Sequence, residues 1–109
     1  MECATAQEAI DLLHHCLDHG AVIPGRHFRD ELAKGDLSVG DAFTVLDSGG
    51  IYNPPEPDIR TGEWNWRVEG REPGGTWMAI VFSFKTVEKA FLITIFSIEL
   101  GSKRKGGKR

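Results

Sequence analysis

The sequence predicts an α+β fold, in which N-terminal helices pack on one face of a three- to four-stranded antiparallel sheet. Apolar residues recur at helical spacing up to about residue 50, and beyond it they alternate as in strands. A length of 109 residues with 40% hydrophobic content suits one domain with a small core. We expect this domain to span residues 1–101 and a disordered basic tail to occupy residues 102–109.

The first helix is expected from Ala6 to His19. Thr5 and Glu8 stand three apart, the spacing of a capping box, which satisfies two free amide donors at a helix start. Gly20 is expected to end this helix in a left-handed conformation. The apolar stripe of the helix consists of Ala6, Ala9, Ile10, Leu13, Cys16 and Leu17. We therefore expect this side to face the core.

Two shorter helices are expected before the pattern changes. The first covers residues 25–34, where Phe28 and Leu32 stand one turn apart as its buried pair. The second begins at a Ser38 cap and ends near Asp47. Its inward face consists of Ala42, Val45 and Leu46.

The second half of the chain predicts strands. Residues 51–58, "IYNPPEPD", predict a short strand followed by a loop, because proline lacks the amide donor that a central strand needs. Residues 64–69 alternate, with tryptophans and a valine on one face and polar groups on the other. Residues 76–84 and 90–98 are apolar on both faces and predict the central strands, joined by a hairpin at 85–89.

The charges are distributed unevenly, although the formal net charge is only −3. Residues 1–58 hold three basic and eleven acidic residues, and residues 59–101 hold five of each. The last eight residues, "SKRKGGKR", hold five basic residues and no acid. Such a tail either contacts a polyanion such as RNA, through Lys103, Arg104 and Lys105, or serves only to keep the protein in solution. The acidic front half argues against a protein that simply coats nucleic acid.

Several classes of protein are disfavoured by what the sequence lacks. No apolar run approaches the ~20 residues of a membrane-spanning helix, and no secretion signal opens the chain, so a cytoplasmic protein without membrane contact is expected. The two cysteines, Cys3 and Cys16, are expected to be reduced thiols. Phosphate-cradling glycine loops and nucleophile elbows are absent, which disfavours nucleotide-driven and acyl-transfer enzymes and a small-molecule substrate.

The histidines of the first helix are candidate metal ligands. His15 and His19 stand one helical turn apart, with Asp11 and Asp18 nearby. No further ligand group is indicated elsewhere, and such residues are common on the wet face of an amphipathic helix. No metal and no other cofactor are therefore expected.

The order of several short motifs resembles a known family. His27 on a helix is followed by Leu37-Ser38 opening the next helix, then by Gly50-Ile51-Tyr52 and by a meander ending in Ile93-Thr94-Ile95. Over residues 26–98 the chain resembles small bacterial domains related to the RelE/BrnT-like toxins of toxin–antitoxin systems. The resemblance implies a RelE-like fold, a metal-independent endoribonuclease activity and an antitoxin protein as partner, with RNA or the ribosome as a further contact.

Cleaving RNA without a metal requires a base for the 2′-hydroxyl proton, cations for the phosphate and an acid for the leaving oxygen. The expected catalytic residues are His27 as base or acid, Arg67 as phosphate ligand and Thr94 as a hydroxyl that positions a phosphate oxygen. The expected RNA-binding residues, besides the three in the tail, are Arg29, Arg60 and Lys85.

An alternative is a catalytically inactive member of the same fold that acts as a protein-interaction module. Glu31 stands where the family has an arginine, and it forms an ordinary helical pair with His27. Arg67 is equally suited to pair with a carboxylate on a solvated sheet face. The two hypotheses differ in where His27 points: toward a hollow shared with Arg67 and Thr94, or away from the sheet into solvent.

Overall fold

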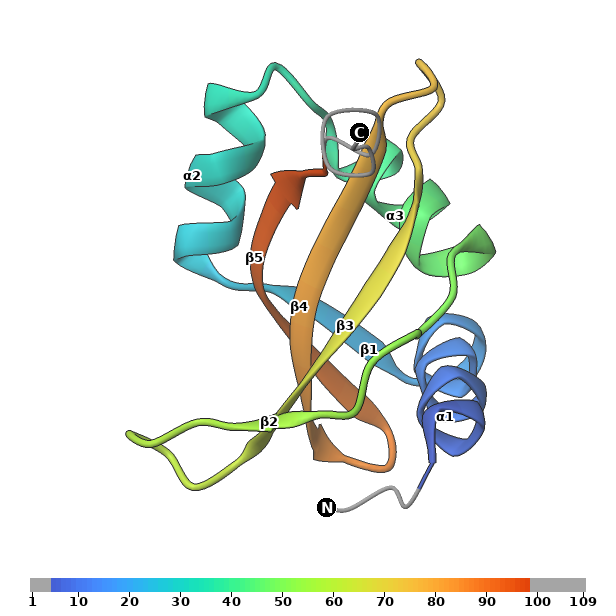
Figure 1. The fold of residues 1–109 in the computed structure, drawn as a ribbon, viewed down its shortest axis with the longest axis vertical. Coiled ribbons are helices and arrows are strands. Elements are labelled where there is room, and N and C mark those ends of the chain that lie inside the picture. The colour runs from blue at the N-terminus through green and yellow to red at the C-terminus, as the bar shows by residue number, and fades with distance from the viewer. Residues whose placement is uncertain (1–4, 99–109) are drawn as a thin grey trace, which may run out of the picture.

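The computed structural model describes residues 5–98, which form an α+β domain of three helices and a five-stranded mixed sheet (Figure 1). In chain order the elements are α1 (Ala6–His19), β1 (Ala21–Pro24), α2 (Arg26–Lys34), α3 (Val39–Ser48), β2 (Glu56–Pro57), β3 (Trp64–Arg71), β4 (Trp77–Thr86) and β5 (Lys89–Ser97). None of the helices among these residues is long and apolar enough to cross a membrane.

The sheet has the strand order β1-β5-β4-β3-β2, with β1 parallel to β5 and the other neighbours antiparallel. The α+β class is therefore confirmed, and β2 to β5 are antiparallel as expected, but the sheet has a fifth strand, β1, which is parallel to β5. Strand β1 has only four residues between two helices and ends in Pro24, which is too short for an alternation to show. Strand β2 consists of two residues inside the proline-rich loop.

The region 51–58 also differs from its prediction. No strand forms at Ile51 and Tyr52; instead, a single bridge joins Gly50 to Glu69 before the chain leaves the sheet. The pairing with β3 resumes only at Glu56 and Pro57. Proline residues between these two points withhold the amide donors that a continuous ladder would need.

The helix starts confirm the sequence analysis, whereas one helix end corrects it. Capping boxes are present at Thr5 with Glu8 and at Ser38 with Asp41. The φ of Gly20 is −117°, so the expected left-handed conformation is wrong. Glycine is needed there for another reason, because a Cβ at this position would collide with the backbone carbonyl of Glu88.

The core lies on one face of the sheet. In Figure 1, α3 lies to the right of the strands and partly behind them, α1 lies at the lower right, and α2 runs beside β5. Fully buried side chains from both layers meet there: Leu13, Phe28, Val45, Leu46, Val68, Ile80, Phe82 and Leu92. Trp66 is also in this core, 3% exposed, whereas Trp64 at the strand start is 40% exposed. The opposite face of β3, β4 and β5 is covered by neither α1 nor α3.

Candidate functional site on the open sheet face

Two of the three expected catalytic residues lie on the uncovered face of the sheet. Arg67 pairs with Val81, and Val81 pairs with Thr94, so the three form one row across β3, β4 and β5. Directly opposite residues in a sheet point to the same side. The adjacent row on this side contains Glu69, Ala79 and Phe96. We call the surface made by these two rows the open face.

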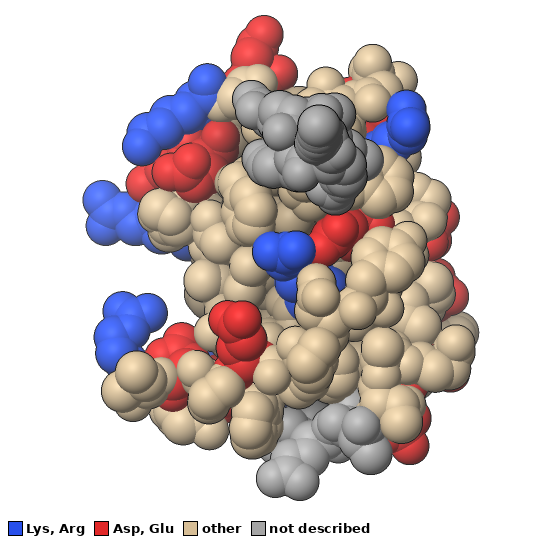
Figure 2. Space-filling model, viewed as in Figure 1, with Lys and Arg blue, Asp and Glu red and all other residues tan. Residues whose placement is uncertain are grey.

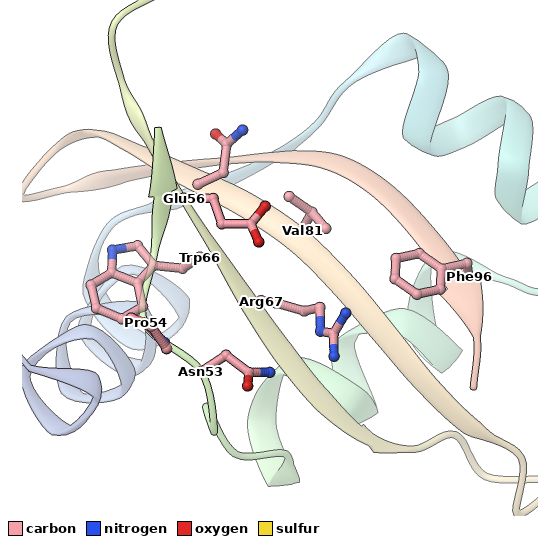
Figure 3. A pocket seen from close by; sticks show the side chains of 8 residues that line it. Asn53, Pro54, Glu56, Trp66, Arg67, Val81 and Phe96 are labelled. Carbon is pink, nitrogen blue, oxygen red and sulfur yellow. The ribbon is translucent and has the colours of Figure 1, made fainter. Parts of the chain in front are cut away.

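A hollow of about 550 Å³ lies over the open face (Figure 3). Its lining combines the strands with the segment that precedes β3: Asn53, Pro54, Glu56, Asn65, Trp66, Arg67, Val81 and Phe96. The guanidinium of Arg67 lies in the middle of this group, with Asn53 and Glu56 on one side and Phe96 on the other. The hollow therefore contains a cation, an acid, two amides and an aromatic ring.

The charge of Arg67 is compensated within the protein. Its Nε donates a hydrogen bond to Glu69 Oε2 at 2.8 Å, and its Nη2 lies 2.7 Å from the same oxygen. The guanidinium also lies 5.9 Å from the ring centroid of Phe96. The Glu69 side chain is only 11% exposed, so its carboxylate needs this cation. A phosphate would have to compete with a partly buried carboxylate for Arg67.

Two of the expected RNA-binding cations are compensated in the same way. Lys85 Nζ donates to Glu63 Oε1 at 2.8 Å and lies 5.2 Å from the Phe91 ring centroid. Arg60, whose side chain is 86% exposed, lies 3.8 Å from Asp58 Oδ1 in the loop before β3. These positions provide pairs of opposite charge rather than a basic patch.

Glu56 differs from the other carboxylates around the hollow. It is exposed, and within residues 5–98 it makes no ion pair and no side-chain hydrogen bond. Figure 3 shows its carboxylate on the same side of the sheet as Arg67. Because Arg67 is already paired, Glu56 leaves the hollow with one uncompensated negative charge.

The structure does not bring His27 to the open face. His27 lies in the first turn of α2, its side chain is 66% exposed, and its ion-pair contact is Glu31 at 3.9 Å. It does not line the hollow that contains Arg67. Arg29 is exposed on the same helix and forms no ion pair within the described part of the chain. The expected tail contacts, Lys103, Arg104 and Lys105, lie outside the described residues, as does the expected tail itself.

No group of three or more histidine, cysteine, aspartate and glutamate side chains within residues 5–98 is arranged to hold a metal ion. His15 instead lies 2.7 Å from Glu88, and its ring lies 5.4 Å from that of His19.

Two groups have shifted pKa values, and both shifts follow from local structure. The amide of Arg60 and the side chain of Asn65 donate to Asp58, which lowers the pKa of that carboxyl. Burial, and secondarily the charge of Glu88, raises the pKa of the Cys16 thiol. Neither group lines the hollow, so neither shift indicates a catalytic acid or base there.

The sequence analysis placed Arg67 and Glu69 on the same polar face of their strand, because they stand two apart, but it did not expect them to pair with each other. The pairing of Glu63 with Lys85 joins residues 22 apart in the sequence and depends on the register between β3 and β4. Comparison with protein family models, curated proteins and solved structures found no significant match to this chain.

Proposed function

We propose that this chain is a catalytically inactive member of a RelE-like fold and acts as a protein-interaction module, binding a protein partner of the antitoxin kind through its open face. The observation that carries the proposal is the pairing of the cations. Arg67 and Lys85, the two cations beside the expected site, each lie within 2.8 Å of a carboxylate. A phosphate in the hollow would gain little from cations that are already neutralised, and it would face those carboxylates.

The position of His27 supports the same conclusion. Metal-independent cleavage needs a base, a cation and an acid around one phosphate. Arg67 and Thr94 share a row of the sheet, but His27 projects from α2 into solvent beside Glu31. The imidazole is thus missing from the surface where the other two residues meet.

The charge of the described part suits a protein partner with basic side chains. Residues 5–98 hold eight lysines and arginines against fourteen aspartates and glutamates, a formal charge of −6. Figure 2 shows acidic and basic groups interspersed on the side that carries the open face. Phe96, 41% exposed, adds an aromatic surface to the same hollow, across Arg67 from the unpaired Glu56 (Figure 3). An exposed aromatic ring within a polar rim is typical of protein interfaces.

A second candidate function rests on one specific arrangement. Glu69 lies in the row next to Arg67 and Thr94, and a carboxylate beside an arginine is able to serve as the base for a 2′-hydroxyl. In this version of the endoribonuclease hypothesis Glu69 takes the role first given to His27. It requires Arg67 to leave Glu69 for the phosphate during the reaction.

One assay separates the two functions. Purified protein is incubated with long single-stranded RNA, with and without chelator, alongside the double variant H27A/R67A and the single variants R67A and E69Q. We expect no cleavage by any of them. R71A is the matched control, because Arg71 is on the same strand but lies over the Trp77 ring, outside the hollow. Cleavage by the wild type and R71A, but not by R67A or E69Q, would overturn the proposal.

The binding function has its own test. A photo-crosslinking amino acid is placed at Phe96 on the open face and, as a control, at Val39, which is 43% exposed on α3. In the source cells we expect a discrete adduct with a protein other than a second copy of this chain from position 96, and none from position 39. Equal labelling at both positions, or none at either, contradicts a partner on the open face.

A further inference from the structure

A projecting arm is the most unusual surface feature of the molecule. It consists of residues 56–65, which include β2, the following loop and the start of β3, and it extends away from the body at the lower left of Figure 1. Ile59 at its tip is 97% exposed, and the neighbouring Arg60 side chain is 86% exposed. A fully exposed isoleucine leaves its whole apolar surface in water, which is unfavourable relative to burial.

The tip is held in a defined conformation. Asp58 N donates to Glu63 O at 2.8 Å, Gly62 N donates to Asp58 O at 2.8 Å, and Arg60 N donates to the Asp58 carboxylate at 2.9 Å. Gly62 has a φ of 75°, which glycine adopts without strain. Because the loop is ordered in advance, little conformational entropy is lost when Ile59 enters a partner.

A hollow whose lining suits the tip of the arm lies at the opposite end of the molecule. A hollow of about 430 Å³ lies between the C-terminal end of α2 and the ends of β4 and β5, with an apolar floor that includes Leu37, Met78 and Ile95. Glu31 is on its rim, 29% exposed. Within the described residues, Glu31 Oε2 is paired only with neighbours on its own helix: Lys34 Nζ donates to it at 3.5 Å, and His27 Nε2 lies 3.9 Å away. Both partners are largely exposed, so these pairs are weak, and an incoming guanidinium competes for the carboxylate with two parallel donors.

We propose that two copies of this chain associate by placing the arm of each in the 430 Å³ hollow of the other. Ile59 then covers the apolar floor, and Arg60 exchanges its 3.8 Å contact with Asp58 for a pair with Glu31 of the second copy. Arm and hollow lie at opposite ends of the molecule, so a two-fold axis between antiparallel copies forms both contacts together and closes the assembly as a dimer. The contact is small, and its dissociation constant lies in the micromolar to millimolar range. This self-association is a separate proposal from partner binding, although Phe96 lines both hollows and Glu56 of the arm lines the hollow on the open face.

Sedimentation equilibrium of the full chain, from about 10 µM to 1 mM, tests the proposal. We expect a monomer–dimer equilibrium in the wild type. I59D removes two apolar insertions per dimer and should raise the dissociation constant at least about tenfold. V87D is the matched control, because Val87 is an exposed apolar residue, 50% exposed, in the β4–β5 turn, and it should leave the equilibrium unchanged.

A charge exchange gives the sharper result. R60E and E31R should each weaken dimerisation, since each places like charges at both contacts. A mixture of R60E and E31R chains should form heterodimers, because each arm then meets a hollow of opposite charge. Circular dichroism checks that all variants remain folded. A wild type that stays monomeric at every concentration, a mixture that gives no heterodimer, or an equal effect of V87D would overturn the proposal.

Discussion

Glu69 determines what Arg67 is able to do. A carboxylate that is only 11% exposed is poorly solvated, so its charge depends on the guanidinium next to it. The arginine in turn directs two of its donors toward one oxygen and has fewer left for a ligand. On the open face, therefore, the residue expected to bind phosphate acts first as the counter-ion of a partly buried acid.

A double-mutant cycle tests this role. R67M should lower the free energy of unfolding by about 1–2 kcal/mol, less than for a fully buried pair because the Arg67 side chain is 42% exposed. In the E69Q background the same substitution should cost about 1 kcal/mol less, because no charge is left unpaired. Urea denaturation followed by circular dichroism measures the free energy of unfolding of each variant in the two backgrounds. Additive effects of the two substitutions would mean that the pair contributes nothing to stability.

The packing of α3 on the sheet depends on two glycines. A Cβ at Gly49 would lie 2.5 Å from Glu69 O and 2.6 Å from Val45 O, and one at Gly70 would lie 2.9 Å from the Gly49 Cα. The end of α3 and strand β3 thus approach each other backbone to backbone, joined by the Gly50–Glu69 bridge. This contact positions β3, and with it Arg67 and Glu69, relative to the helical layer.

Alanine substitutions at the two ends of α3 should change the stability of the protein in opposite directions. Gly49→Ala should destabilise the protein by about 1–3 kcal/mol, because the new methyl group meets backbone atoms that cannot move aside. Gly40→Ala in the exposed first turn should be neutral or stabilise by up to about 1 kcal/mol, since its nearest neighbour is Ser38 Oγ at 3.5 Å. Thermal unfolding monitored by circular dichroism compares the two. Similar melting temperatures for both variants would contradict the close packing described here.

The conformation of the arm depends on Asp58, which accepts hydrogen bonds from the amides of Arg60 and Gly62. D58A removes the acceptor for the Arg60 amide, so the amides of Arg60 and Gly62 should exchange with solvent severalfold faster. D58N retains a side-chain oxygen and should stay close to the wild type. Because the pKa of Asp58 is lowered on folding, its contribution is present above the unfolded pKa of 3.8 and is lost as the pH falls through the folded value. Hydrogen exchange measured by NMR at neutral and acidic pH provides the comparison.

At the scale of the whole molecule, the sequence predicted the parts of the fold that are local. The capping boxes at Thr5 and Ser38 and the two long strands arise from spacing along the chain, and they formed as expected. The parallel strand β1 was not predictable in this way. Its four residues are ordered by pairing with β5, about 68 residues later, and the sequence around them shows only two helices separated by a short apolar segment.

The residues of the candidate site likewise differ in whether local spacing or long-range pairing determines their positions. Arg67 and Thr94 lie in one row, but alternation did not predict this, because Thr94 stands two residues after the buried Leu92. The register shift between Val81 and Phe82 moves Thr94 to the side of Arg67. The orientation of His27 depends on which side of α2 the core residues Phe28 and Leu32 occupy, and these direct it into solvent. Glu63 was not predictable as the partner of Lys85, because only the register between β3 and β4 places the two side by side.

The charge distribution of the whole chain yields the last prediction. Residues 5–98 carry −6, whereas residues 102–109 carry five basic groups and no acid. A chain that ends at residue 101 should lose most of its affinity for single-stranded RNA and gain severalfold in affinity for a lysine- and arginine-rich peptide at low salt. Fluorescence anisotropy at about 50 and 200 mM salt measures both affinities.

A full-length variant with serine at the five basic tail positions separates the effect of charge from that of length. If the shortened chain bound RNA as tightly as the full one, the RNA site would lie on the folded part, and the endoribonuclease with Glu69 as base would become the better account of the open face.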